Sequence, residues 1–166
     1  MRRRELFASL VAAGMLFAMG KGARMLGLTK IKILFVAGFG PIVHDLAASR
    51  NLYEGTLRIA FKEESGGYLH TDALDGAKTF ALWPLSQAAQ SCFGHDVWPE
   101  RLPVPKAWLE FDVDNVETAT VELESQGYRM LVKNKKEPWG QTVSRFLDPD
   151  DVLVGITFTL WMREKK

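Results

Sequence analysis

At 166 residues, the chain corresponds to one domain of about 150 residues. Its composition of 47% hydrophobic and 25% charged residues excludes disorder along the whole length, and a net charge of +1 argues against a dedicated nucleic-acid surface. The single cysteine cannot form an internal disulfide, and the sequence has no run of about twenty uncharged apolar residues to predict a membrane-spanning helix.

Residues 1–28 differ from the rest of the chain. Three arginines precede the apolar stretch Leu6–Met19, which is typical of a signal peptide, and Arg3–Phe7 resembles a twin-arginine export signal. A convincing cleavage site is missing, so the alternative is an upstream extension with initiation at Met25. We therefore expect a cytoplasmic protein or, as the alternative, an exported one, and we leave residues 1–28 out of the predicted domain, 29–166.

The first module, about 30–85, reads as strand, helix and three strands. Its first strand contains Gly38 and Gly40, which suggest a bulge or a close approach by another group. Asp45 is a good N-cap for the helix that follows. The expected elements, in chain order, are a strand at Lys30–Val43, a helix at Leu46–Gly55, strands at Leu57–Glu63 and Gly67–Asp72 joined by a turn at Ser65–Gly67, and a strand at Lys78–Trp83.

A crossing loop, 86–105, precedes the second module, about 106–162. The loop begins with a short helix at Ser86–Cys92, and its Trp98 either covers a cavity as a lid or packs the loop down. A basic run at Lys133, Lys135 and Lys136 predicts a solvated turn. The module's expected elements are strands at Trp108–Val113, Tyr128–Val132, Gln141–Leu147 and Val152–Trp161, a helix from the cap Asn115 to Gly127, and a turn at Asp148–Asp151.

The two modules repeat each other at an offset of about 70 residues. Val43–Leu46 aligns with Val113–Val116, and the β-α-β-β-β order of predicted elements occurs twice. A repeated order of elements is less easily produced by chance than a short sequence match, so the sequence predicts an internal duplication.

These features resemble the vicinal oxygen chelate superfamily of glyoxalases, bleomycin-resistance proteins and extradiol dioxygenases. The resemblance covers about residues 31–160. It rests on Val43–Leu46 with Tyr53, Glu110–Val116, Leu123 with Gly127-Tyr128, Trp139-Gly140, and Phe146–Asp150, where Asp151 replaces the usual glycine. It implies an α+β fold of two βαβββ modules, whose curved mixed sheets surround a central cavity, and often a homodimer.

Metal-using members of this superfamily bind a divalent ion through side chains on four strands. The family spacing places those ligands at Gly38, Trp108 and Gly155, and near Ala81 or Trp83. None of these side chains supplies the nitrogen or oxygen donor that a divalent ion needs. We therefore expect no metal site and no cofactor.

Aromatic and charged residues remain as candidates for the wall of the cavity. On strict alternation Trp108 and Glu110 face the same way, and Glu110 could pair with an amine of a ligand or with Arg145 as a structural bridge. Such a cavity suits a flat organic ligand, including a cationic one. The candidate ligand-binding residues are Phe39, His70, Trp83, Trp108, Glu110, Trp139 and Arg145.

Other chemistry-bearing residues give weaker signals. His70 and Asp72 lie on one strand face and form either a polar site or an ordinary half-exposed pair. Cys92 is expected to be a buried thiol and not a nucleophile for the nearby His95. His44 precedes a helix cap and is expected at the surface.

Three functions stay open at this point. The first is a metal-free binding protein that sequesters an aromatic or amphipathic compound, as bleomycin-resistance relatives do. The second is a metal-dependent lyase, isomerase or dioxygenase whose ligands lie elsewhere. The third is an interaction module with a filled cavity, because such folds host many functions. The first implies a small organic ligand as partner and neither nucleic acid nor membrane.

Overall fold

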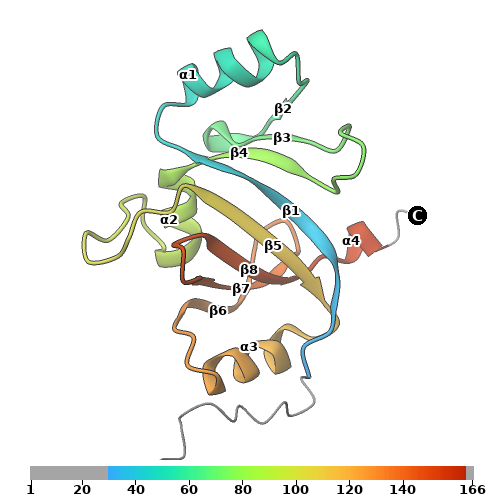
Figure 1. Cartoon of the computed structure of the whole chain (residues 1–166), viewed down its shortest axis with the longest axis vertical. Helices are drawn as coiled ribbons and strands as arrows, with labels where there is room; N and C mark the ends of the chain where they lie inside the picture. Colours follow the sequence, from blue (N-terminus) through green and yellow to red (C-terminus); the bar gives the residue numbers. More distant parts are fainter. Residues whose placement is uncertain (1–29, 164–166) are drawn as a thin grey trace, which may run out of the picture.

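The computed structural model describes residues 30–163, and the signal-like segment lies outside them. One curved, eight-stranded sheet has the order β2-β3-β4-β1-β5-β8-β7-β6. From each edge of the sheet to its centre, the strands follow an equivalent order, β2-β3-β4-β1 in one half and β6-β7-β8-β5 in the other. The halves meet where β1 pairs antiparallel with β5 (Figure 1). The α+β class and the two βαβββ modules predicted from the sequence are confirmed.

The first half follows the predicted order with shorter elements. They are β1 (Ile33–Val43), α1 (Leu46–Arg50), β2 (Lys62–Glu63), β3 (Leu69–Thr71) and β4 (Phe80–Pro84). The long strand predicted at Leu57–Glu63 is wrong over most of its length. The chain instead continues from α1 as a π-helical turn, Asn51–Thr56, and Arg58 then has a left-handed backbone with φ of 60°. The amides of Leu57 and Ile59 donate back into this turn, so they are not available to a neighbouring strand.

The second half contains α2 (Leu85–Phe93), β5 (Ala107–Val113), α3 (Val116–Ser125), β6 (Met130–Lys136), β7 (Thr142–Leu147), β8 (Leu153–Phe158) and α4 (Leu160–Arg163). The last strand is therefore shorter than predicted. It ends because the amide of Thr159 donates to the carboxylate of Asp112 at 2.7 Å, and α4 follows. The predicted lysine turn is also wrong: these lysines lie in β6, where Lys133 pairs with Glu124.

Equivalent caps begin the helices of the two modules. The carboxylate of Asp45 accepts the amide of Ala48 at 2.9 Å, and the side-chain oxygen of Asn115 accepts the amide of Thr118 at 2.8 Å. Both caps satisfy an amide that the first helical turn leaves unpaired. The matched caps agree with the predicted duplication.

Helices α1 and α3 pack on the outer face of the sheet, one on each half. Leu46 and Tyr53 pack against Leu82 and Leu69, and the residues of α3 pack against Phe146, Val154 and Ile156. Helix α2 lies on the opposite, inner face, where it contacts β1, β4 and β6. Figure 1 shows α1 and α3 at the two ends of the molecule and α2 beside the middle of the sheet. Within the described residues, no helix is long and apolar enough to cross a bilayer.

Candidate functional site

One row of four residues crosses the inner face of the sheet. Gly38 pairs with Glu110, Glu110 with Gly155, and Gly155 with Arg145, on the strands β1, β5, β8 and β7. Residues that pair directly on neighbouring strands share one face of the sheet. The long side chains of Glu110 and Arg145 therefore project from the face on which Gly38 and Gly155 carry no side chain. The row places a carboxylate and a guanidinium next to each other in the interior.

The two glycines are needed for space. A Cβ on Gly155 would lie 2.6 Å from Cγ of Glu110, and a Cβ on Gly38 would lie 2.7 Å from Cη2 of Trp108. Both distances are too short for carbon atoms in van der Waals contact, whose separation is about 3.5–4.0 Å. Glu110 therefore lies over Gly155, and the indole of Trp108 lies over Gly38.

A buried ionic cluster, Ser91, Glu110, Glu137, Gln141 and Arg145, occupies this part of the interior. Nη2 of Arg145 donates to Oε1 of Glu110 at 2.8 Å, and its Nη1 donates to Ser91 at 2.6 Å and to Glu137 at 3.1 Å. Gln141 donates to the second oxygen of Glu110 at 3.0 Å. Arg145 is only 2% exposed, so its charge depends on these partners.

The environment of the cluster shifts the pKa of two of its groups. Burial pushes the pKa of Glu137 up, but the hydrogen bond from Ser91 and the charges of Arg145 and Lys135 together hold that pKa below its ordinary value. Burial is the largest influence and acts to lower the pKa of Arg145. The charge of Glu110, the effect of Cys92, the hydrogen bond between Arg145 and Glu110 and the charge of Glu137 together outweigh burial and raise that pKa. Lys135 adds a second cation, 3.1 Å from Oε2 of Glu137. Two carboxylates and two cations balance each other in charge.

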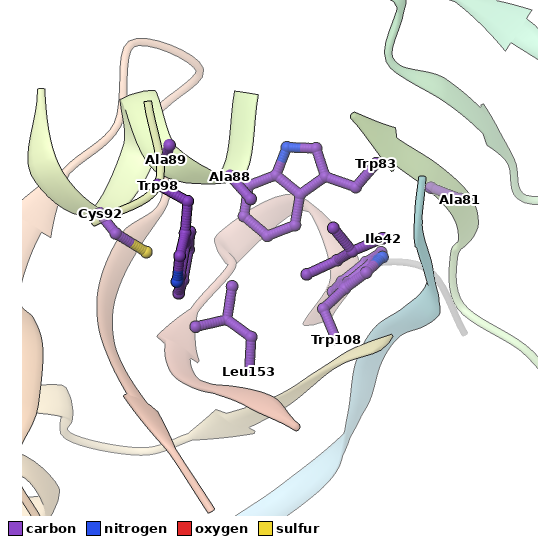
Figure 2. Close-up of a cluster of buried hydrophobic side chains, with 9 residues drawn as sticks. All are labelled: Ile42, Ala81, Trp83, Ala88, Ala89, Cys92, Trp98, Trp108 and Leu153. Carbon is purple, nitrogen blue, oxygen red and sulfur yellow. The ribbon is translucent and has the colours of Figure 1, made fainter. Parts of the chain in front are cut away.

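Indole rings adjoin the ionic cluster. Trp83 and Trp108 meet edge to face with ring centres 5.6 Å apart, and the guanidinium of Arg145 lies 5.0 Å from the centre of the Trp83 ring. Figure 2 shows both indoles between α2 and the strands, with Trp98 on the side of Cys92. Tyr68, half-buried, contacts Trp83 at 6.5 Å between ring centres. Burial, and then the nearby charge of Glu110, raises the pKa of the Tyr68 phenol.

Two buried donors in this region lack a partner among the described residues. They are the indole Nε1 of Trp108 and Nε of Arg145. Trp108 is 5% exposed, so water does not satisfy its N–H from bulk solvent. An unpaired buried donor costs about 1–3 kcal/mol.

The structure brings together four of the predicted ligand-binding residues: Trp83, Trp108, Glu110 and Arg145. Of the two alternatives for Glu110, the structure contains the bridge to Arg145. His70 lies at the edge of the group, stacked on Tyr68, with its Nε2 3.3 Å from Glu64 and its Nδ1 3.7 Å from Asp72.

Two predicted ligand-binding residues lie apart from this group. Phe39 packs edge to face on Phe80 on the outer face and is 40% exposed. Trp139 is 56% exposed, in the turn between β6 and β7, and its indole donates a hydrogen bond of 3.0 Å to Gln141. The odd-even alternation of a strand separates Phe39 from Gly38 and Gly40, which face inward.

Sequence reasoning missed Ser91, Glu137, Gln141 and Tyr68. A signal for Ser91 existed, because it falls on the same face of α2 as the buried Ala88 and Cys92. Glu137 carries no comparable signal in the sequence, since the run of lysines before it predicts a solvated turn. Its burial follows only from the course of β6 past α2.

The residues at the four expected ligand positions do not fit a divalent cation. These positions hold Gly38 on β1, Trp108 on β5, Gly155 on β8, and Ala81 and Trp83 on β4. Glu110, the nearest carboxylate, already accepts from Arg145 and Gln141. Among the described residues, no group of three or more His, Cys, Asp or Glu side chains is placed to hold a metal ion.

For Trp98 and Cys92 the sequence leaves two alternatives each, and the structure shows one of them. Trp98 packs its loop down: it is buried, and its indole donates to the carbonyl of Pro103 at 2.9 Å. Cys92 is a buried free thiol, and burial raises its pKa to about 11. A thiol with this pKa is a weak nucleophile near neutral pH.

Comparison with known proteins supports the assignment that the paired modules suggest. A model of the glyoxalase-like domain matches residues 38–160. The chain belongs to the glyoxalase-like domain family. The resemblance predicted from the sequence is thereby confirmed, and the match runs through both modules of this glyoxalase-like chain. No curated protein matches it.

Solved structures similar to the glyoxalase-like chain are distant. A methylmalonyl-CoA epimerase from Streptomyces coelicolor, in complex with 2-nitronate-propionyl-CoA, is 15% identical with a TM-score of 0.46, covering 77% of this chain and 96% of its own. A glyoxalase/bleomycin resistance protein/dioxygenase from Nocardioides is 18% identical with a TM-score of 0.34, covering 76% and 84%. A hypothetical protein from Bacillus halodurans is 16% identical with a TM-score of 0.47, covering 78% and 95%.

Proposed function

We propose that this glyoxalase-like chain is a metal-free binding protein that holds a small, flat organic molecule against Trp83 and Trp108. Sequestration of such a compound is the role we assign to it. The single observation that carries the proposal is the row Gly38, Glu110, Gly155, Arg145, in which glycines replace metal donors and the remaining carboxylate pairs with an arginine.

The chemistry of the row supports binding without a metal ion. A divalent ion requires several oxygen or nitrogen donors at about 2.0–2.6 Å. Glu110 could offer such donors only by giving up the hydrogen bonds from Arg145 and Gln141. Arg145 would then lose one of its two buried carboxylate partners, and breaking a buried ion pair costs about 3–5 kcal/mol.

The aromatic walls support a flat ligand. The planes of the two indoles lie at 77° to each other, so they offer a ring face and a ring edge. Each aromatic contact contributes about 0.5–1.5 kcal/mol beyond the burial of area. Tyr68 is the half-buried neighbour of Trp83, so we place the entry of the ligand past its ring. The homodimer that the resemblance implies stays a prediction.

A thermal-shift screen of the full, chelator-treated chain tests the proposal. Flat aromatic compounds should raise the unfolding temperature, because a ligand at 100 times its Kd adds about 2.7 kcal/mol to stability. Nickel, zinc, manganese and iron ions should not raise it. The variant Trp83→Leu should lose the response, and Trp139→Leu, which removes an exposed indole, should retain it. Stabilisation by a metal ion without any organic hit would contradict the proposal.

A second candidate, the interaction module with a filled interior, is favoured by the packing of α2. Ala88 and Ala89 of this helix are fully buried against the inner face, together with Trp98. Two surface hollows of about 310 and 420 Å³ lie elsewhere, one lined in part by Phe61 and the other by His44. If no organic compound changes the unfolding temperature and no metal ion does, this candidate replaces the first.

A further inference from the structure

The site also indicates which chemical class of ligand it accepts. We propose that its ligand is an uncharged aromatic molecule that carries a hydrogen-bond acceptor, such as a ring carbonyl, and not a cation. This inference rests on the proposed function, and it specifies that the flat organic ligand is neutral and carries a hydrogen-bond acceptor.

The first step is the inventory of unpaired polar atoms. Nε1 of Trp108 and Nε of Arg145 are both donors, and both belong to side chains at least nine-tenths buried. A ligand gains most where it pairs a group that the empty protein leaves unpaired. Donors of this kind call for an acceptor on the ligand.

The second step is the use of the acceptors. All four carboxylate oxygens of Glu110 and Glu137 are engaged, by Arg145, Gln141, Ser91 and Lys135. An ammonium or other organic cation would have to take a carboxylate from a buried cation. The separated cation would then lose a counter-charge in a medium of low dielectric constant.

The third step concerns the face of Trp83. The guanidinium of Arg145 lies over this ring at 5.0 Å, so the attraction of the ring for a cation is already used. A cationic ligand stacked on Trp83 or Trp108 would approach Arg145 and meet charge repulsion. An uncharged ring meets none.

Matched probes test the class of ligand by isothermal titration of the full chain. The probes are 1-methylquinolin-2-one, which is neutral with a carbonyl acceptor and no N–H donor, the flat cation 1-methylquinolinium, and naphthalene, which is neutral without an acceptor. We expect the quinolinone to bind at least about ten-fold more tightly than either of the others, the factor that corresponds to about one good hydrogen bond. Tighter binding of the cation or of naphthalene would overturn the inference while leaving the proposed function intact.

Variants at two buried indoles provide the control. Trp108→Phe keeps the ring wall and removes the unpaired N–H, so we expect the affinity for the quinolinone to fall about ten-fold and that for naphthalene to stay unchanged. Trp98→Phe removes an indole N–H that already donates to Pro103, and it should leave both affinities unchanged. Equal losses for both probes in Trp108→Phe would contradict a role for the N–H group.

A failed titration is also decisive. If none of the three probes binds but the thermal-shift screen finds a cationic or acceptor-free ligand, the inference is wrong and the proposed function stands. If the screen finds only acceptor-bearing neutral aromatics, the inference holds with a different ring. If the screen finds no organic ligand, both fall together.

Discussion

The carboxylate of Glu110 reaches Arg145 by crossing over Gly155, with Oε1 and Nη2 2.8 Å apart. Three neighbouring strands, β5, β8 and β7, carry the three residues in register. The resemblance places a metal ligand at Gly155. In this chain the side chain of Glu110, from the neighbouring strand β5, fills the same place, and its negative charge is neutralised by the guanidinium of Arg145.

Breaking this pair should destabilise the fold strongly. Glu110→Leu leaves Arg145 short of a counter-charge in the interior, and Arg145→Met does the same to Glu110. We expect each variant to lose about 3–5 kcal/mol in chemical unfolding. The double variant should lose less than the sum of the two, with a coupling of about 1–3 kcal/mol. Additive losses would mean that the two side chains act independently.

Gly155→Ala should destabilise the fold, because the interior has no space for the added methyl group. Its Cβ would lie 2.6 Å from Cγ of Glu110, an atom near the base of the side chain that cannot move away freely. We expect a loss of about 1–3 kcal/mol, typical of an overpacked core, on top of any weakening of the ion pair. In the Glu110→Ala background the added methyl group should cost little stability. The unfolding free energies of the parent chain, the two single variants and the double variant measure this difference. An equal cost in both backgrounds would place the clash elsewhere.

Stability should depend on pH through Glu137. Its pKa is lower in the folded protein than in the unfolded chain, so the folded state binds its proton less well. Its contribution is therefore fully present above the unfolded value, about 4.3, and is lost as the pH falls through the lower folded value. Glu137→Gln should flatten the acid limb of a plot of unfolding free energy against pH.

A surface pair serves as the control for that titration. Glu124 pairs with Lys133 on the exposed side of α3 and β6. Glu124→Gln should leave the acid limb close to that of the parent chain, since exposed ion pairs contribute about 0–1 kcal/mol. If the Glu137→Gln and Glu124→Gln variants change the acid limb of the unfolding free energy by the same amount, the buried cluster does not set the pH dependence.

Cys92 should be protected from thiol reagents in the native protein. The thiol is buried, and its raised pKa of about 11 leaves little thiolate at pH 8. Ellman's reagent should react slowly with the folded chain and rapidly after unfolding in guanidinium. Because the chain has one cysteine, the colour reports this residue alone. Fast reaction of the folded chain would show that α2 opens readily.

Much of the fold could be predicted because its signals are local. Asp45 and Asn115 begin equivalent helices, and the Asp148 side chain accepts the amides of Asp150 and Val152 in the predicted turn. Such signals need only a few neighbouring residues along the chain. The predicted strand at Leu57–Glu63 failed because the end of a π-helical turn has no comparably clear pattern.

In the candidate site, too, the residues that could be predicted are those with signals local in the sequence. Alternation in β5 was sufficient to place Trp108 and Glu110 on one face, and the family spacing was sufficient to identify Gly38 and Gly155 as positions without donors. Ser91 and Glu137 could not be assigned to the cluster, because they are separated by 46 residues and belong to a helix and a strand end that meet only in three dimensions.

The sequence by itself determined the duplicated module, the helix caps and the residue types at the expected ligand positions, since each depends on spacing along the chain. Only the tertiary structure decided which charges neutralise one another and which face α2 covers. Long-range electrostatics and packing depend on which strands become neighbours, and a guanidinium in the interior is stable only where that arrangement brings two carboxylates within hydrogen-bond distance.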